Sequence, residues 1–202
     1  MSGDGDIAGC ILAGGQSRRM GEDKARLLLD GTPLLAQAIA RLEPQVAKLI
    51  VNRHDGTAPI DAQGRPVVTD APGAHQGPLA GILAALSWAE RNGFTFMATV
   101  AVDTPFFPRD LVAKLTMAAR GKEMAVASSG GRVHPVFGLW KTTLVPALTS
   151  FIEDSRRSAQ HWALSHEAGI ADWPSAPYDP FFNINEPADV SIARKVQAEF
   201  RP

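Results

Sequence analysis

The chain has 202 residues, of which 45% are hydrophobic and 20% are charged, and its formal net charge is −1. This length supports one well-buried α/β domain rather than two, and the composition excludes a disordered chain. The nearly balanced charge also excludes a general basic field that would hold nucleic acid.

Along the chain, apolar runs alternate with helical patterns, which is typical of a mostly parallel sheet covered by helices. We predict strands over Ile7–Leu12, Leu49–Val51, Val67–Val68, Phe96–Val102, Met124–Ala127, Val136–Trp140 and Phe181–Ile184. We predict helices over Leu34–Leu42, Leu79–Arg91, Leu111–Ala119 and Pro187–Phe200, with two helical pieces between Leu144 and Ala168. The proline-containing stretch Ala171–Pro180 is predicted to be a loop. With no linker or repeat, residues 1–202 are expected to form a single domain, a three-layer αβα sandwich of the α/β class.

Cys10 is the only cysteine, so the chain cannot form an internal disulfide, and it lies inside the first predicted strand. The lack of disulfides is consistent with a reducing compartment. No apolar run reaches membrane-spanning length, and residues 1–6 are acidic and polar rather than a cationic signal. We therefore expect a cytoplasmic monomer that binds neither a membrane nor nucleic acid.

The first predicted strand leads into a segment that is rich in glycine and in cations. The glycines are Gly14, Gly15 and Gly21, and the cations are Arg18, Arg19, Lys24 and Arg26. Glycine lets the backbone N–H groups approach a polyphosphate, and the cations neutralise its oxygens. The segment is neither a Walker loop nor a dinucleotide turn. We expect Lys24 and Arg19 to hold the β- and γ-phosphates; the alternative is a basic surface turn with solvated cations, of which Arg26 is the best example.

Polar residues end the other predicted strands, at the edge where parallel sheets bind ligands. They are Asn52, Asp70, Asp103, Asn183 and Asn185. A lone carboxylate that follows a buried strand is costly unless it is paired, and magnesium favours one or two protein oxygens plus substrate phosphates. We predict that Asp103 binds Mg²⁺ with Asn185 as the second oxygen donor; the alternative is that Asp103 caps the following helix.

Asn52 and Asp70 have hydrogen-bonding groups suited to a base or a ribose, although turn chemistry alone also favours Asn and Asp after strands. Gly77 to Gly81 opens a helix with small residues, which either admit a base or only allow close packing. His134 is expected to be packed or hydrogen-bonded, and the pair Arg156-Arg157 either binds an anionic second substrate or is solvated. The sequence contains neither zinc-ligand spacing nor a nucleophilic serine elbow.

The opening signature resembles that of the glycosyltransferase-A-like nucleotidyltransferases, and most of all that of the molybdenum cofactor guanylyltransferases. It reads Leu12-Ala13-Gly14-Gly15-x-Ser17-x-Arg19-Met20-Gly21-x-Asp23-Lys24, and further blocks follow at Val51-Asn52, Thr69-Asp70, Gly77–Gly81, Asp103-Thr104-Pro105, His134-Pro135 and Asn183-Ile184-Asn185. The resemblance implies a Rossmann-like sheet of the nucleotide-diphospho-sugar transferase type. It implies GTP binding at Leu12, Ala13, Gly14, Lys24, Asn52 and Asp70, with Mg²⁺ at Asp103.

The implied reaction joins GTP to molybdopterin that carries molybdenum, giving the guanine dinucleotide and pyrophosphate. The terminal phosphate of the pterin would attack the α-phosphorus in line, without a covalent enzyme intermediate. The residues alone leave three alternatives open: a cytidylyltransferase for the same pterin, a sugar-phosphate nucleotidyltransferase, and an inactive nucleotide-binding regulatory protein. Passing on the finished cofactor requires transient contact with biosynthetic or acceptor proteins, which the sequence does not identify, and residues 154–169 match no pattern for pterin contacts.

Overall fold

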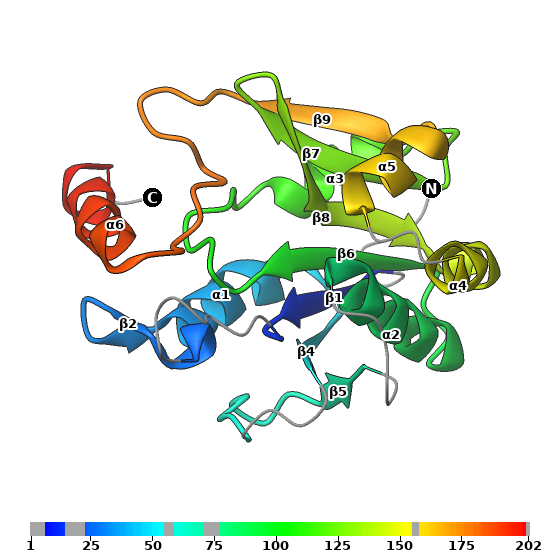
Figure 1. Ribbon diagram of the computed structural model, residues 1–202, viewed down its shortest axis with the longest axis horizontal. Helices are drawn as coiled ribbons and strands as arrows, with labels where there is room; N and C mark the ends of the chain where they lie inside the picture. Colours follow the sequence, from blue (N-terminus) through cyan, green and yellow to red (C-terminus); the bar gives the residue numbers. More distant parts are fainter. Residues whose placement is uncertain (1–6, 15–22, 55–58, 71–76, 155–157, 201–202) are drawn as a thin grey trace.

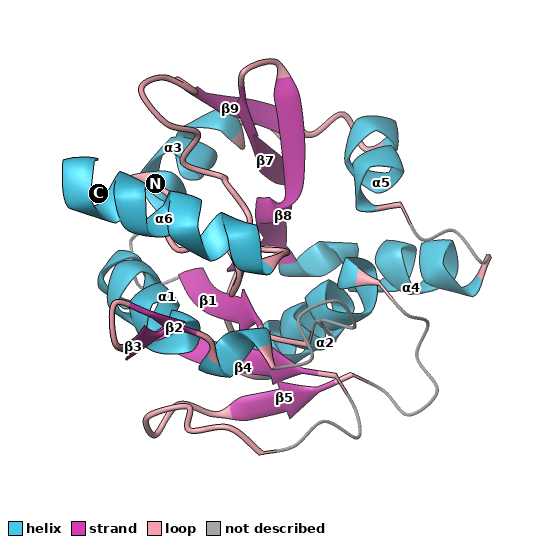
Figure 2. Cartoon of the chain, turned by 60° about the vertical axis from the view of Figure 1, so that its left-hand side comes forward, coloured by secondary structure: helices cyan, strands magenta, loops and turns pink. Residues whose placement is uncertain are grey.

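The computed structural model describes residues 7–14, 23–54, 59–70, 77–154 and 158–200. Within these residues a seven-stranded sheet runs through the molecule with helices on both faces, as Figures 1 and 2 show from two sides. Its strands are β1 (Ile7–Leu12), β4 (Lys48–Arg53), β5 (Val67–Thr69), β6 (Phe96–Ala101), β7 (Met124–Ser129), β8 (Arg132–Lys141) and β9 (Gly169–Trp173).

The strand order is β5-β4-β1-β6-β8-β7-β9. Strand β1 is parallel to both β4 and β6, and β4 is parallel to β5, while β8 is antiparallel to β6 and β7. The chain therefore extends the sheet from β1 in both directions. The carboxyl ends of β1, β4, β5 and β6 lie at one edge, beside the point where the winding reverses, which is where open α/β sheets bind ligands.

The helices and minor elements complete the three layers. The α-helices are α1 (Leu34–Leu42), α2 (Pro78–Arg91), α3 (Leu111–Ala118), α4 (Val145–Glu153), α5 (Ala159–Ser165) and α6 (Pro187–Phe200). The 3-10 helices are η2 (Lys24–Arg26), η3 (Glu43–Gln45) and η4 (Thr142–Leu144), and a small hairpin pairs β2 (Leu28–Leu29) with β3 (Thr32–Pro33).

Alternate residues of β1 point into two separate apolar cores. Ile7 and Ile11 pack with residues of α1 and α3, whereas Ala8 and Cys10 pack with residues of α2, α4 and α5. This alternation follows from the two-residue period of a strand. Cys10 is fully buried, and this burial raises the pKa of its thiol, so the side chain acts as a small apolar group.

Most predicted elements are confirmed, including the hairpin between β7 and β8 and the break between α4 and α5. Two predictions about the C-terminal part are wrong. Residues Phe181–Ile184 do not form a strand, and β9 lies where the sequence predicted the start of a loop. Strand β9 pairs in parallel with β7 and is the last strand of the sheet on that side.

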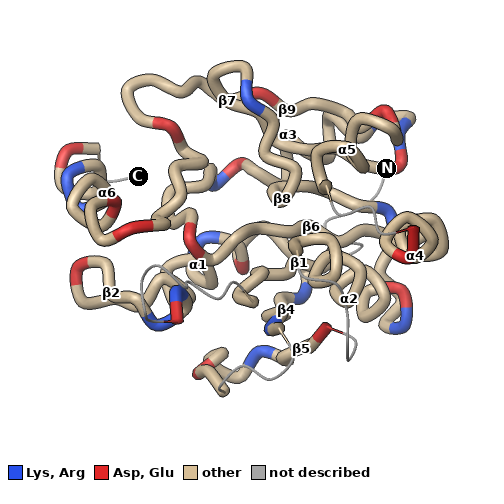
Figure 3. The backbone as a smooth tube through the Cα atoms, viewed as in Figure 1, with Lys and Arg blue, Asp and Glu red and all other residues tan. Residues whose placement is uncertain are grey.

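Charges of both signs are interspersed over the described chain (Figure 3). Among the described residues, no helix combines the length and apolar character that crossing a bilayer requires.

Candidate active site

A cavity of about 430 Å³ opens at the sheet edge where the ends of β1, β4 and β6 meet. Its lining includes predicted residues from distant parts of the sequence: Leu12, Gly14, Lys24, Asn52, Asp70 and Asp103. Asn183 also lines it, together with Gly77, Pro78 and Gly81 at the start of α2. The fold thus brings the residues that follow the parallel strands into one site.

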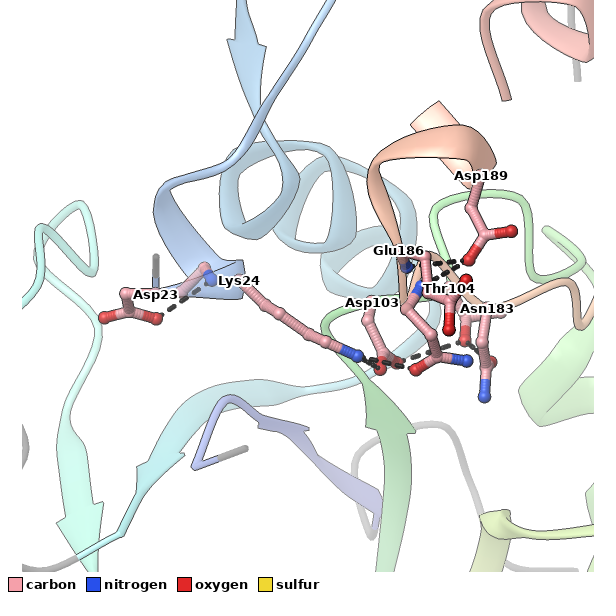
Figure 4. A network of polar contacts seen from close by, with 9 residues as sticks. Asp23, Lys24, Asp103, Thr104, Asn183, Glu186 and Asp189 are labelled. Atoms are coloured by element: carbon pink, nitrogen blue, oxygen red, sulfur yellow. Dashed lines mark hydrogen bonds and ion pairs between the residues drawn. The ribbon is translucent and has the colours of Figure 1, made fainter. Parts of the chain in front are cut away.

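Lys24 extends across this site from η2 toward the end of β6 (Figure 4). Its Nζ atom lies 2.7 Å from Oδ2 of Asp103 and 2.7 Å from Oδ1 of Asn185. The Lys24 side chain is only 11% exposed. One carboxylate oxygen and one amide oxygen, from segments far apart in sequence, therefore converge on a single cation.

Asp103 is tied to the segment that carries the two asparagines. The backbone N–H of Ile184 donates to the carbonyl of Asp103 at 2.8 Å, and the hydroxyl of Thr104 donates to Oδ1 of Asn183. Ile184 is thereby held against the end of β6 and is buried without being part of a strand. Asp103 does not cap the next helix, because α3 begins at Leu111 with Asp110 at its N-cap position.

Asn52 and Asp70 form a buried pair at the other end of the cavity. Nδ2 of Asn52 donates to Oδ1 of Asp70 at 2.8 Å and to the carbonyl of Val68 at 3.2 Å. Nδ1 of His54 lies 3.1 Å from the second carboxylate oxygen of Asp70. Asn52 and Asp70 are 2% and 6% exposed, so the two side chains hold each other in fixed positions.

The start of α2 requires glycine at two positions. Gly77 precedes the helix with φ of +143°, and Pro78 begins it. A Cβ atom at Gly81 would lie 2.5 Å from Oδ1 of Asn52. Gly81 thus allows the close approach of α2 to β4, and residues of this block line the cavity, whereas a base placed against them stays a prediction.

The buried guanidinium of Arg53 contacts two residues that flank positions 14–22, Ala13 and Asp23. Nη1 donates to the carbonyl of Ala13 at 2.7 Å and to Oδ1 of Asp23 at 3.2 Å, and Nη2 donates to Oδ2 of Asp23 at 2.8 Å. Burial by itself would raise the pKa of Asp23, but hydrogen bonds from Arg53 and from the Ala25 N–H outweigh it, and the net pKa is lowered. Asp23 is therefore ionised at neutral pH.

Some predicted residues are not described by the structure, and others do not line the cavity. Gly15, Arg19 and the pair Arg156-Arg157 lie outside the described residues. Ala13 contributes backbone rather than lining: its N–H donates to the carbonyl of Asn52. Arg26 turns away toward the carbonyl of Pro59. Sequence reasoning missed Arg53 and His54, although both directly follow the predicted site residue Asn52 at the end of β4.

His134 is packed and hydrogen-bonded, as the sequence predicted. Its Nε2 atom lies 2.7 Å from Oγ of Ser129, which donates to Oδ1 of Asp179 at 2.8 Å. The ring stacks on Phe181 with 4.6 Å between centroids. Burial lowers the pKa of His134, partly opposed by the charge of Asp179.

The described residues contain no group of three His, Cys, Asp or Glu side chains that could hold a metal ion. The convergent oxygens of Asp103 and Asn185 nevertheless match the donors that magnesium prefers when substrate phosphates supply the remaining ligands. These two side chains therefore fit a substrate-assisted metal site better than an all-protein one.

Residues 9–168 match the family model described as "MobA-like NTP transferase domain". The chain is 43% identical over 201 residues to a molybdenum cofactor guanylyltransferase from Rhizobium leguminosarum, covering 96% of this chain and 94% of that protein. It is 41% identical to another from a Bradyrhizobium species, covering 95% and 93% of the two chains. The crystal structure of molybdopterin-guanine dinucleotide biosynthesis protein A from Archaeoglobus fulgidus has the same fold. Its TM-score is 0.73 at 20% identity, over 96% of this chain and 100% of that one.

Proposed function

This chain belongs to the MobA-like NTP transferase domain family and, within it, to the molybdenum cofactor guanylyltransferases, and from that premise we propose how its residues transfer GMP. The donor is GTP, the acceptor is the terminal phosphate of molybdenum-bearing molybdopterin, and the second product is pyrophosphate. The observation that carries this proposal is one cavity with acceptor groups at one end and a cation held by two oxygens at the other.

The Asn52 and Asp70 end of the cavity suits guanine better than cytosine. Nδ2 of Asn52 donates its two hydrogens to the Asp70 carboxylate and to the Val68 carbonyl. Both partners can only accept, so the orientation of the Asn52 amide is fixed. Asn52 and Asp70 therefore offer oxygen acceptors. Guanine donates from both N1–H and its 2-amino group, whereas the matching edge of cytosine has two acceptors and a single donor group.

The Lys24 end suits the triphosphate. Its ammonium reaches the cavity from η2, and Gly14 lines the same cavity. Neutralising the charge that builds on departing pyrophosphate is the main demand of this type of transfer. Lys24 is assigned that role, with Arg19 as a second cation from the same segment.

A divalent ion, which we propose to be Mg²⁺, fits the oxygens of Asp103 and Asn185 that hold the Lys24 ammonium. When bound, the ion would polarise the phosphate oxygens and neutralise part of their charge. Asp103 is fixed for this task by the Ile184 N–H, and Asn185 by Asp189, which accepts from the Asn185 N–H at 2.8 Å.

The reaction needs no general base. An oxygen of the pterin phosphate bonds to the α-phosphorus of GTP while the bond from that phosphorus to the β-phosphate oxygen breaks, and the electron pair leaves with pyrophosphate. A phosphate monoester has a second pKa of about 6, so the attacking group is already ionised near neutral pH. The protein's contribution is to align the two substrates and to neutralise charge.

The test compares three nucleotides with the purified protein, molybdenum-bearing molybdopterin and Mg²⁺, with pyrophosphate release as the readout. GTP should react fastest. Inosine triphosphate lacks the 2-amino group, so its kcat/KM should fall by about 10-fold or more, the usual effect of losing a hydrogen bond to a charged acceptor. Faster turnover with CTP would favour the cytidylyltransferase alternative. Nucleotide binding without pyrophosphate release would favour the inactive regulatory protein.

We propose that the protein works as a monomer in the cytoplasm, with contacts to biosynthetic or acceptor proteins limited to handover of the finished cofactor. The buried single cysteine and the balanced charge support this setting.

A further inference from the structure

We infer that Arg53 is a positioning residue, which holds Ala13 and Asp23 in place relative to each other and thereby fixes the start of Lys24 beside the cavity. This inference rests on the proposed function, because Lys24 matters only if a polyphosphate binds there. No sequence motif singles out Arg53, which follows the site residue Asn52 at the end of β4.

The contacts of Arg53 join two residues on either side of positions 14–22, Ala13 and Asp23. Ala13 directly precedes Gly14, and Asp23 is the first residue that the structure describes after Gly14. The same Nη1 atom donates to both of them, at 2.7 and 3.2 Å, and Nη2 completes a two-pronged ion pair with Asp23 at 2.8 Å. One planar guanidinium therefore fixes the distance between Ala13 and Asp23, which the single ammonium of a lysine could not do.

Asp23 connects Arg53 to Lys24, because it also fixes the start of η2. Its Oδ1 atom accepts from the backbone N–H of Ala25 at 3.0 Å and so caps η2, whose first residue is Lys24. At the far end of that side chain, the ammonium meets Asp103 and Asn185. A continuous series of contacts thus runs from Arg53 through Asp23 and η2 to the ammonium.

The ion pair between Arg53 and Asp23 is shielded from solvent enough to hold the two side chains in place. The side chains of Arg53 and Asp23 are 6% and 23% exposed, so solvent screens them less than a surface pair. Asp23 remains charged at neutral pH because its hydrogen bonds lower its pKa. A misplacement of about 1 Å in a group that stabilises the transition state can cost about 100-fold in rate. Arg53 can therefore control catalysis without touching the substrate.

The first test measures the position of Lys24 without using activity. Acetic anhydride labels accessible amines, and mass spectrometry of peptides from the full-length protein gives the labelling rate of Lys24. In the wild-type protein the rate should be low, because the side chain is 11% exposed. Arg53→Lys and Asp23→Asn should each raise it by about 10-fold. An unchanged rate in both variants would overturn the inference, whether or not the proposed reaction is correct.

The matched control is Arg41→Lys. Arg41 is also a buried guanidinium that donates to a backbone carbonyl, that of Phe107 at 3.0 Å, but it lies on α1 and does not line the cavity. This variant should leave the labelling rate and kcat at wild-type values even if it melts at a lower temperature. If Arg53→Lys does not fold, Asp23→Asn tests the same ion pair at its more exposed residue.

The second test is a double-mutant cycle in the transfer reaction. Arg53→Lys should lower kcat by about 10- to 100-fold with a smaller change in the KM for GTP. In a Lys24→Ala background the same substitution should change kcat less than 2-fold, because its effect acts through Lys24. Independent, multiplied effects would overturn the inference, whereas a wild-type protein that releases no pyrophosphate would overturn the proposed function instead.

Discussion

At the scale of single residues, the Lys24 ammonium occupies the point where the oxygens of Asp103 and Asn185 converge. Magnesium binds oxygens at about 2.1 Å, and its charge would repel an ammonium at the same point. Metal and ammonium therefore exclude one another from these two oxygens. Binding of a metal ion would therefore move the ammonium off these oxygens toward a phosphate, while Asp23 still holds the backbone of η2 in place, so metal binding and release of the ammonium are linked.

This exclusion predicts opposite effects of two substitutions on metal affinity. Without nucleotide, Lys24→Met should raise the affinity for Mn²⁺ by about 10-fold, since charge-assisted hydrogen bonds that compete for the oxygens are removed. Asp103→Asn should lower it. Electron paramagnetic resonance of free Mn²⁺ measures both, and Lys48→Met, on an exposed lysine at the start of β4, is the control. Equal affinities in all the proteins would contradict the exclusion.

The site residues that sequence reasoning found are those whose place follows from strand direction. Asn52, Asp70 and Asp103 each follow an apolar run, and parallel strands bring their carboxyl ends to the same edge. Arg53 could not be found in this way. An arginine after a strand looks like a surface cation until the fold buries it, and its partners Ala13 and Asp23 are brought to it only by tertiary structure.

At the scale of elements, the prediction differs from the structure in the C-terminal part of the sheet, where the two-residue period of β9 was overlooked. In β9, Gly169, Ala171 and Trp173 are buried while the residues between them are exposed, an alternation typical of a strand with one covered face. The nearby prolines outweighed that signal in the prediction. Phe181 and Ile184 are buried because they pack into the apolar core that also contains residues of α1 and α3, and nothing local distinguishes that burial from the burial of a strand.

The close approach of α2 to β4 predicts the effect of Gly81→Ala. Alanine favours a helix by about 1 kcal/mol over glycine, but its Cβ would lie 2.5 Å from Oδ1 of Asn52. The clash should displace Asn52, raise the KM for GTP several-fold and cost about 1–3 kcal/mol of stability. Steady-state kinetics and urea unfolding measure these effects. Ser87→Ala, on the same helix, should change neither, and an unchanged KM in Gly81→Ala would refute the predicted contact of Asn52 with the base.

The connection from β9 to α6 is held by the contacts of His134, which predicts a pH dependence of stability. The folded pKa of His134 lies below its ordinary value of 6.5 because the ring is buried. Above pH 6.5 the ring is neutral in both states. As the pH falls below 6.5, the unfolded chain takes up the proton first, so the free energy of unfolding decreases.

Replacing this ring should remove that dependence. Urea unfolding at about pH 7.5 and about pH 5.5 gives the loss of stability for the wild-type protein and for His134→Gln. The loss should be smaller in the variant, although the variant is less stable at the higher pH because its contacts with Ser129 and Phe181 change. An equal loss in both proteins would assign the acid sensitivity to other groups.

At the scale of the whole molecule, one sheet separates two apolar cores that share the strands β1, β4 and β6. If these strands unfolded, both cores would be exposed to solvent. The architecture could be predicted from the sequence because the alternation of apolar runs and helical patterns determines it, whereas the strand order beyond β6 depends on pairings that no local pattern encodes.

We propose on this basis that residues 1–202 unfold as one unit. Circular dichroism in the far ultraviolet, which reports helices and strands, and in the near ultraviolet, which reports aromatic packing, should give the same urea midpoint. GTP with Mg²⁺ should shift both midpoints together. Separate midpoints would indicate two domains and contradict the proposal.

The pairing of Asp103 with the segment around Ile184 also has a consequence for biosynthesis. A ribosome makes Asn52 and Asp70 more than a hundred residues before Asn185, so a nascent chain contains the groups proposed to recognise the base long before it contains both oxygens of the cation site. Any nucleotide captured during translation would therefore meet an incomplete site, and we expect competence for transfer only after the segment around Asn185 has been made.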